Sequence, residues 1–247
     1  MPLPSPLLSS FARAALALSL LAAGAAQAQA PAAAPPAGET DRQDYSAAER
    51  LLFMTPQLGG LKPPQTLHYS FHKAGGLEPG YDDKVAVLLS PQADGSCCAA
   101  RGEFLSAERR LKLPELPAAE SNPVILYFLE HDVREMQRLT KGSQNHFRQR
   151  IRMAVYKGAT VRDVSVRWRG QAVKAKEVSF APYLDDPNRP KYPKFAVKEY
   201  HFVLSDAVPG GVYGIRTRIA AQDSAAAPLI VEELYAEGAE PADAKTP

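Results

Sequence analysis

Residues 122–157 read NPVILYFLEHDVREMQRLTKGSQNHFRQRIRMAVYK, the only long helix-period segment in a chain that otherwise has the pattern of short strands. Apolar side chains recur at helical spacing from Ile125 to Leu139. Asn122-Pro123 predicts the helix start, because Asn caps well and Pro is favoured at the first helical position. Lys141-Gly142 predicts its end, and Ser143 can cap a second helix. The apolar stripe of that second helix is Phe147, Ile151, Ala154 and Val155.

The segments on both sides of this stretch alternate between apolar and polar residues, which predicts half-buried strands. Pro209-Gly210-Gly211 is a strong hairpin turn, and most of the other connections are also short. Strands joined by short turns form antiparallel sheets. We therefore predict an α+β fold: a curved, half-barrel-like antiparallel sheet of about eight strands, with an N-terminal helix capped by Ser46 and an inserted helical pair. The expected strands cover residues 65–73, 84–90, 103–113, 164–169, 172–180, 195–204, 212–220 and 229–236.

This order of elements resembles that of the periplasmic half-barrel carriers of lipoproteins (LolA/LolB-like), over most of residues 46–236. The resemblance implies a fold that holds a lipid or another hydrophobic ligand between sheet and helices, and it transfers no functional residue. The run from Phe128-Leu129-Glu130 to Arg150-Ile151-Arg152 also resembles a run in uncharacterised exported proteobacterial proteins, which implies no activity.

The N-terminus has the pattern of a cleavable secretory signal. Arg13 precedes an apolar Ala/Leu run, and Ala26-Gln27-Ala28 is a small-x-small cleavage site. The apolar run is shorter than the roughly 20 residues of a spanning helix. We expect a periplasmic protein with no transmembrane segment in its mature chain. Its expected parts are a signal peptide (1–28), a disordered Ala/Pro-rich leader (29–44), one α+β domain (45–236) and a disordered tail (237–247).

Charge and motif content disfavour several classes of function. The formal net charge is +2, and removing residues 1–28 takes away only Arg13, which leaves +1. A near-neutral exported chain has no general attraction for nucleic acid. The sequence has no Gly-x-Ser-x-Gly elbow and no phosphate-binding glycine loop. We therefore predict no enzyme activity, no cofactor and no nucleic-acid partner.

A ligand site is predicted where the helical pair meets the sheet. Arg148 and Arg152 share one helix face and could bind an anionic headgroup. Tyr69, Phe71 and Trp168 would supply apolar surface from the strands. Two alternatives stay open. The arginines could simply pair with acids of the first helix, and the aromatic residues could fill an ordinary core. In the second case the protein would be a cell-envelope interaction or assembly factor with a protein partner.

The acids and histidines of the first helix allow two interpretations. His131 and Glu135 are four residues apart, so they share a helix face and could reach one metal ion. No second histidine completes a zinc-protease pattern. Spacings of four and three residues also favour ion pairs between Glu130 and Arg134 and between Glu135 and Arg138, each worth a few tenths of a kcal/mol. We predict these pairs and no metal site.

Cys97 and Cys98 are the only two cysteines of the chain, and they are adjacent. In an oxidising compartment they could form a disulfide with each other, stay as thiols or bond to another chain. Adjacent Cα atoms about 3.8 Å apart lie below the usual range for a disulfide. The pair follows a predicted turn at Asp94-Gly95-Ser96 and lacks thioredoxin-type spacing. A disulfide or redox role is predicted here without a choice among the alternatives.

Overall fold

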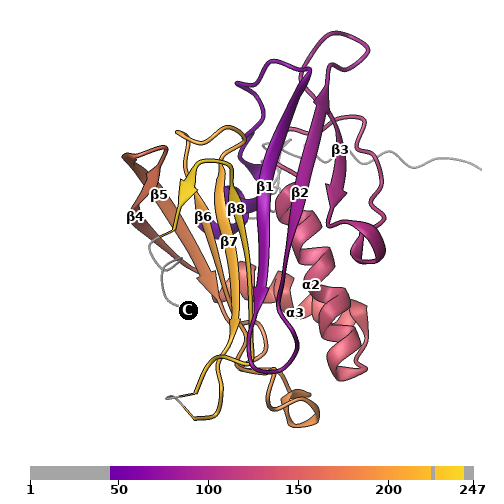
Figure 1. Cartoon of the computed structure of the whole chain (residues 1–247), viewed down its shortest axis with the longest axis vertical. Helices are drawn as coiled ribbons and strands as arrows, with labels where there is room; N and C mark the ends of the chain where they lie inside the picture. Colours follow the sequence, from indigo (N-terminus) through magenta and orange to yellow (C-terminus); the bar gives the residue numbers. More distant parts are fainter. Residues whose placement is uncertain (1–44, 224–225, 242–247) are drawn as a thin grey trace, which may run out of the picture. The chain divides into compact units, whose positions relative to one another are not determined.

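The computed structural model describes residues 45–223 and 226–241. The predicted signal peptide, the leader and residues 242–247 of the predicted tail lie outside these ranges. The described residues form one curved antiparallel sheet with the strand order β3-β2-β1-β8-β7-β6-β5-β4-β9 (Figure 1). Together with its helices this sheet confirms the predicted α+β class, including the helical pair that follows the third strand.

In the second half of the chain every predicted strand is present, but β4 begins four residues before its predicted start. The prediction of a strand at residues 195–198 is wrong, because the chain turns there and the Lys198 N–H donates to the Phe195 carbonyl. The nine strands are β1 (Gln65–Ala74), β2 (Tyr81–Ser90), β3 (Ala99–Phe104), β4 (Thr160–Trp168), β5 (Gln171–Phe180), β6 (Glu199–Leu204), β7 (Val212–Ile219), β8 (Ile230–Ala236) and β9 (Ala239–Glu240). The last of these falls in the predicted disordered tail. That prediction is wrong for residues 239–240, because Ala239 and Glu240 pair with Trp168 and Arg167 of β4.

The prediction of a third strand at residues 103–113 is wrong. The strand ends at Phe104 because Leu105 and Ala107 adopt the left-handed region, with φ of 62° and 48°. The chain then makes a short turn of helix, η2 (Ala107–Arg109), and comes back along the outer edge of β3. Two isolated antiparallel bridges, Phe104–Leu111 and Ala100–Leu116, cover part of that edge.

The predicted helices begin at their predicted caps or one residue later. Ser46 accepts the Glu49 N–H and the Glu49 carboxylate accepts the Ser46 N–H, which confirms the capping box. The Asn122 side-chain oxygen accepts the Val124 N–H at 3.1 Å, but the N-cap residue of the long helix is Pro123, so this helix begins one residue later than predicted. The helices are α1 (Ala47–Glu49), which continues as η1 (Arg50–Met54), α2 (Val124–Thr140), α3 (Gln144–Lys157) and η3 (Arg189–Lys191).

The break between α2 and α3 differs from its prediction. Lys141 takes the left-handed conformation (φ 59°), rather than Gly142. Gly142 is needed for another reason: a Cβ on it would lie 2.6 Å from Cζ of Phe147. Ser143 occupies the cap position of α3, but its side chain makes no capping hydrogen bond. Close packing of the α3 core residue against the link therefore explains the glycine.

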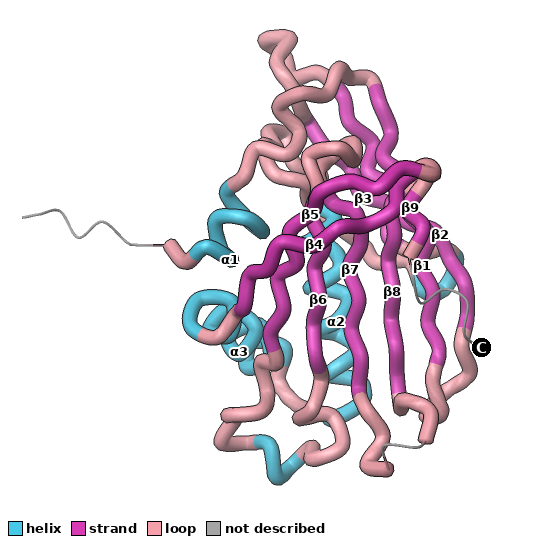
Figure 2. Tube along the Cα trace, turned by 90° about the vertical axis from the view of Figure 1, so that its left-hand side faces the viewer, coloured by secondary structure: helices cyan, strands magenta, loops and turns pink. Residues whose placement is uncertain are grey.

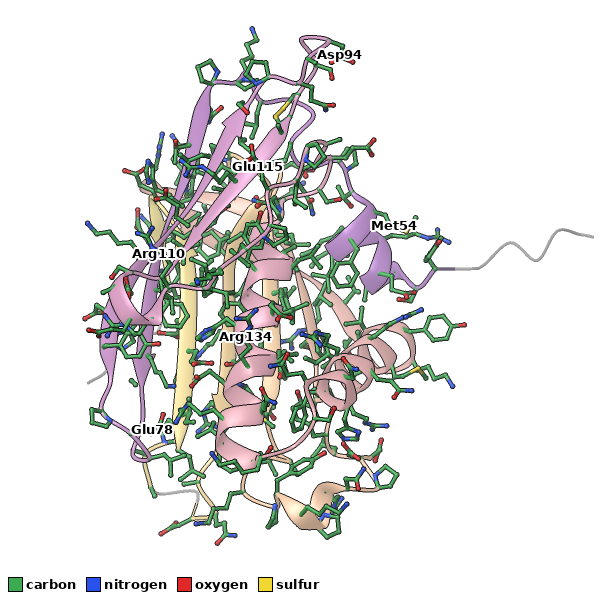
Figure 3. The ribbon with its side chains drawn as sticks, turned by 90° about the vertical axis from the view of Figure 1, so that its right-hand side faces the viewer. Met54, Glu78, Asp94, Arg110, Glu115 and Arg134 are labelled. Atoms are coloured by element: carbon green, nitrogen blue, oxygen red, sulfur yellow. A yellow bond between two sulfur atoms is a disulfide. The ribbon has the colours of Figure 1, made fainter. Side chains whose placement is uncertain are left out.

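Helices α2 and α3 lie on one face of the curved sheet (Figures 2 and 3). Side chains fill the layer between α2 and the sheet. The ring centroids of Phe71 and Phe104 are 6.0 Å apart, those of Phe104 and Phe128 are 6.5 Å apart, and His131 packs against Phe71 at 5.5 Å. The expected ligand space between sheet and helices is therefore a packed core. None of the helices in the described ranges combines the length and apolar content needed to cross a membrane.

Candidate functional site

A buried ion pair joins α2 to the start of β6. Asp132 is fully buried and lies against the ammonium group of Lys198, which is 1% exposed. The Tyr200 hydroxyl donates to the second carboxylate oxygen of Asp132 at 2.5 Å, and the hydroxyls of Tyr183 and Tyr200 lie 3.2 Å apart. Burial raises the pKa of Asp132, and Lys198 acts in the opposite direction.

A second group of buried charges joins α2 to β1 and β8. One carboxylate oxygen of Glu232 lies 3.4 Å from both His131 Nε2 and Lys73 Nζ. Lys73 Nζ also donates to Glu135 at 2.8 Å, and Lys198 Nζ lies 3.7 Å from the other oxygen of Glu232. Burial acts to raise the pKa of Glu232, but Lys198, His131 and Lys73 outweigh it and hold that pKa well below its usual range. We call these residues the buried charge cluster: Lys73, His131, Asp132, Glu135, Lys198, Tyr200 and Glu232.

Glu135 stands at the outer end of this cluster. Burial acts to raise its pKa, but hydrogen bonds from Arg138 and Lys73 lower it to about 2. The predicted pairs are both present: Arg138 lies 2.9 Å from Glu135, and Arg134 lies 3.0 Å from Glu130. Across residues 45–223 and 226–241, no three His, Cys, Asp or Glu side chains converge as a metal site would require. The charges of the cluster pair with one another, which is the arrangement of a structural network.

An apolar groove borders the opposite side of α2, and we call it the helix groove. Its volume is about 610 Å³, and its walls are α2, α3, the end of η1 and residues 112–116. Figure 3 looks onto this side of α2, with Arg134 labelled on the helix. Leu126 is 53% exposed, although it is a large apolar residue. The apolar lining comprises Phe53, Leu113, Leu116, Leu126, Leu129, Val133, Ile151 and Val155.

Cations outnumber acids in the groove lining. The charged lining residues are Glu49, Lys112, Glu130, Arg134, Arg148 and Arg152. Glu130 binds both Arg134 and Arg148 at 3.0 Å. By contrast, Arg152 and Lys112 are exposed, and their side chains have no ion pair or hydrogen bond with another described residue. Two cations therefore remain available beside an apolar surface.

A second depression, the side hollow, continues the helix groove. Its volume is about 380 Å³, and it shares Phe53, Leu116 and Leu126 with the groove before extending to Met54. Tyr127 lines the groove, and its buried hydroxyl has no hydrogen-bond partner among the described residues. The remaining lining of the side hollow is Leu52, Ala118, Ala119, Glu120, Ser121, Asn122 and Pro123.

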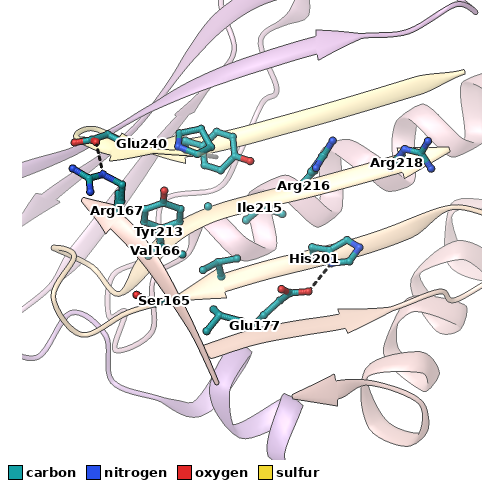
Figure 4. A pocket seen from close by; sticks show the side chains of 15 residues that line it. Ser165, Val166, Arg167, Glu177, His201, Tyr213, Ile215, Arg216, Arg218 and Glu240 are labelled. Atoms are coloured by element: carbon teal, nitrogen blue, oxygen red, sulfur yellow. Dashed lines mark hydrogen bonds and ion pairs between the residues drawn. The ribbon is translucent and has the colours of Figure 1, made fainter. Parts of the chain in front are cut away.

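The helix-free face of the sheet carries a different depression, of about 410 Å³ (Figure 4). Valines and tyrosines of β4, β6, β7 and β8 line it together with charged residues. His201 Nδ1 lies 2.8 Å from Glu177, and Arg167 Nε lies 3.3 Å from Glu240. Two acid–base pairs therefore lie within this depression, and Arg218 also lines it.

The structure separates the five residues predicted to bind a ligand. Arg148 and Arg152 both line the helix groove. Tyr69 is buried and its hydroxyl accepts a hydrogen bond from the Asn122 amide at 2.8 Å, while Phe71 belongs to the packed core. Trp168 lies at the far end of β4, where its indole N–H donates to the Glu237 carbonyl at 3.1 Å. Alternation along β1 points Tyr69 and Phe71 inward, so they cannot reach the groove on the other side of α2.

Cys97 and Cys98 form a disulfide with each other, one of the three predicted alternatives. Cys98 is buried, and its carbonyl accepts the Ala119 N–H at 2.8 Å. The Cys97 sulfur lies 3.4 Å from the Leu58 carbonyl oxygen. The pair therefore supports the segment that forms one wall of the side hollow, and its redox role stays a prediction.

Comparison with solved structures gives distant matches, among them a mycobacterial lipoprotein. No protein-family model matches the chain, and no curated protein does. The crystal structure of the Mycobacterium tuberculosis lipoprotein LppX matches 79% of this chain and 94% of its own chain, with a TM-score of 0.34 and 10% identity. This degree of likeness does not define a family.

Proposed function

We propose that this protein is an exported binding protein that holds a hydrophobic ligand in the helix groove. The observation that carries the proposal is the continuous apolar lining on the outward side of α2, where Leu126 stays half exposed. Binding sites for small molecules are concave and mostly apolar, with a few polar groups placed at their edges. The helix groove has this composition.

The sequence of α2 supports a role for this surface beyond the core. Residues 124–129 are apolar at every position, so α2 has apolar side chains on all sides of its first two turns. The sheet can cover only one side, and a helix that is apolar all round is normally buried on all sides. Residues of η1, α3 and the 112–116 segment cover part of the outer side and leave the groove open.

The experiment is a titration of purified protein with Nile red, a neutral hydrophobic dye. We expect saturable binding that Leu126→Asp weakens by about tenfold or more, because burying a leucine side chain is worth roughly 1.5–3 kcal/mol. Leu184→Asp is the matched control, since Leu184 is 45% exposed and lies outside the groove. It should bind the dye like the wild type.

Melting curves of both variants accompany the titration. Neither substitution removes a buried side chain, so both melting temperatures should stay close to that of the wild type. Equal weakening by the two aspartates, or the absence of saturable dye binding, would contradict the proposed function.

A further inference from the structure

We propose that the ligand of the helix groove is a single-chain amphiphile with an anionic head. Arg152 and Lys112 hold the head, and the tail passes Leu126 into the side hollow. This inference rests on the proposed function above and names the class of its ligand.

The unequal pairing of the cations supports the anionic head. Arg148 and Arg134 already share the carboxylate of Glu130, so their charge is largely compensated. Arg152 lies one turn after Arg148 on the same side of α3, and its guanidinium is exposed and unpaired within the described ranges. Lys112 supplies a second unpaired cation from the opposite wall. A carboxylate or phosphate between them would make charge-assisted hydrogen bonds, which are stronger than neutral ones.

The charge difference between the two depressions determines which one holds the head of the ligand and which one holds its tail. Four cations line the helix groove, but the only charged residue lining the side hollow is an acid, Glu120. An anionic head is therefore favoured at the groove and disfavoured at the side hollow. Phe53 and Leu126 line both depressions, so an alkyl chain that passes over them stays on apolar surface throughout.

Tyr127 favours a ligand that carries a polar end over a plain hydrocarbon. Its side chain lines the groove, and the residue is only 4% exposed. Gly102 of β3 makes room for its ring, since a Cβ there would lie 2.3 Å from Tyr127 Cε2. A buried hydroxyl without a partner costs free energy, and an oxygen of a bound head group could satisfy it.

The test compares three ligands with the same 16-carbon chain below their micelle concentrations: palmitate, hexadecyl phosphate and hexadecanol. In Nile red displacement, palmitate and hexadecyl phosphate should bind the wild type at least tenfold more tightly than hexadecanol. The double variant Arg152→Ala/Lys112→Ala should lose that difference and keep its affinity for hexadecanol. Lys157→Ala is the matched control on α3, because Lys157 is exposed and does not line the groove.

Each outcome tests a different part of the proposal. Equal binding of the three ligands to the wild type would overturn the anionic head while leaving a hydrophobic site in place. Failure of all three, with no saturable binding of the dye, would overturn the proposed function itself. Preference for only one of the two anions would identify the head as a carboxylate or as a phosphate. Binding of an amphipathic peptide with no binding of these ligands would replace the amphiphile with a protein partner.

A separate variant tests whether the tail of the ligand lies in the side hollow. Met54 is 47% exposed and lines the side hollow but not the helix groove. Met54→Asp should weaken palmitate about tenfold and leave the shorter octanoate unchanged, because only the longer chain reaches Met54. An equal effect on both chain lengths, or no effect on either, would contradict this course of the tail.

Discussion

The two sides of α2 differ in the side chains they carry. The side that faces the sheet holds buried polar residues, among them Asp132 and His131, beside core residues such as Phe128. The side that faces away from the sheet holds apolar residues that remain partly uncovered, above all Leu126. Charged side chains are rarely buried unless they are paired, and exposed apolar patches often mark binding surfaces.

This contrast shows that charge density alone is a poor guide to function. The charges on the inner side are compensated by residues of β1 and β8 and by Lys198, so they hold α2 in place against the sheet. The outer side has apolar surface and unpaired cations, the two properties that an amphiphilic ligand requires. We therefore expect substitutions on the inner side to change stability and substitutions on the outer side to change binding.

The largest expected effect comes from removing Lys198. Lys198→Met leaves the carboxylate of Asp132 buried without its cation, with the Tyr200 hydroxyl as its remaining partner. Breaking a buried ion pair in this way costs roughly 3–5 kcal/mol of unfolding free energy. Denaturant unfolding measures the loss. Lys194→Met is the control, because Lys194 is exposed in the same segment and should unfold like the wild type.

A second variant separates charge from packing at this position. Adding Asp132→Asn to Lys198→Met removes the unpaired charge and should recover part of the lost stability. A double variant as unstable as the single one would show that Lys198 contributes mainly through its packing, and the contrast between the two sides of α2 would weaken.

Acid should destabilise the inner side of α2 by a somewhat smaller amount. The folded pKa of Glu135, about 2, is below its ordinary value of 4.5, so its contribution to stability is complete above pH 4.5 and is lost as the pH falls toward 2. The free energy involved is roughly 3 kcal/mol, at 1.36 kcal/mol for each pH unit between the two values. Glu232 acts in the same direction, while Asp132, whose pKa is raised, acts in the opposite one.

Unfolding curves between pH 7 and pH 2 measure this dependence. The Glu135→Gln variant should be less stable than the wild type at pH 7, and the difference should shrink toward pH 2. A difference that stays constant over the whole range would contradict the role assigned to Glu135.

The smallest effect is expected on the outer side, at Glu130. Glu130→Gln breaks ion pairs with Arg134 and Arg148, whose side chains are 46% and 43% exposed. Exposed pairs of this kind contribute about 0–1 kcal/mol, so thermal unfolding should hardly change. The variant also frees two cations beside the groove and should bind palmitate more tightly. A large loss of stability with no gain in palmitate binding would show that the outer side of α2 is structural as well.

The periodicity of the sequence was sufficient to predict most of the fold. The helical spacing of α2, the cap at Ser46 and the alternation along β1 all reflect local rules that the structure obeys. The third strand was misplaced because Leu111 and Leu113 continue an apolar pattern beyond Phe104. The left-handed backbone that ends the strand is at Leu105 and not at a glycine, so the sequence did not indicate it.

The buried charge cluster could have been predicted only by assuming that a lysine at an inward-facing strand position is buried despite its charge. Lys73 has the same strand parity as Tyr69 and Phe71, and Lys198 the same parity as Tyr200. A lysine is normally expected in solvent, and apart from Glu78 the acids that compensate these two lie far away in the sequence. Their partners depend on tertiary contacts that periodicity does not contain.

The sequence predicted the two arginines of the candidate site but not the position of the groove. Arg148 and Arg152 were identified because they share a helix face beside an apolar stripe, and both line the groove. The groove was expected on the wrong side of α2, since the prediction assumed that the sheet leaves a cavity. The signal that could have corrected it is the apolar run at residues 124–129, which is too broad for one covering layer.

The two edges of the sheet have a consequence for how the protein behaves at high concentration. An edge strand with free backbone N–H and C=O groups is a template on which another chain can pair. Here β3 is short and partly covered by the bridges at Leu111 and Leu116, and the tip of β4 is paired with the two residues of β9. Arg162 and Asp163 place charge on the remaining length of β4. The protein thereby exposes apolar surface in the helix groove while its strand edges are protected against self-association.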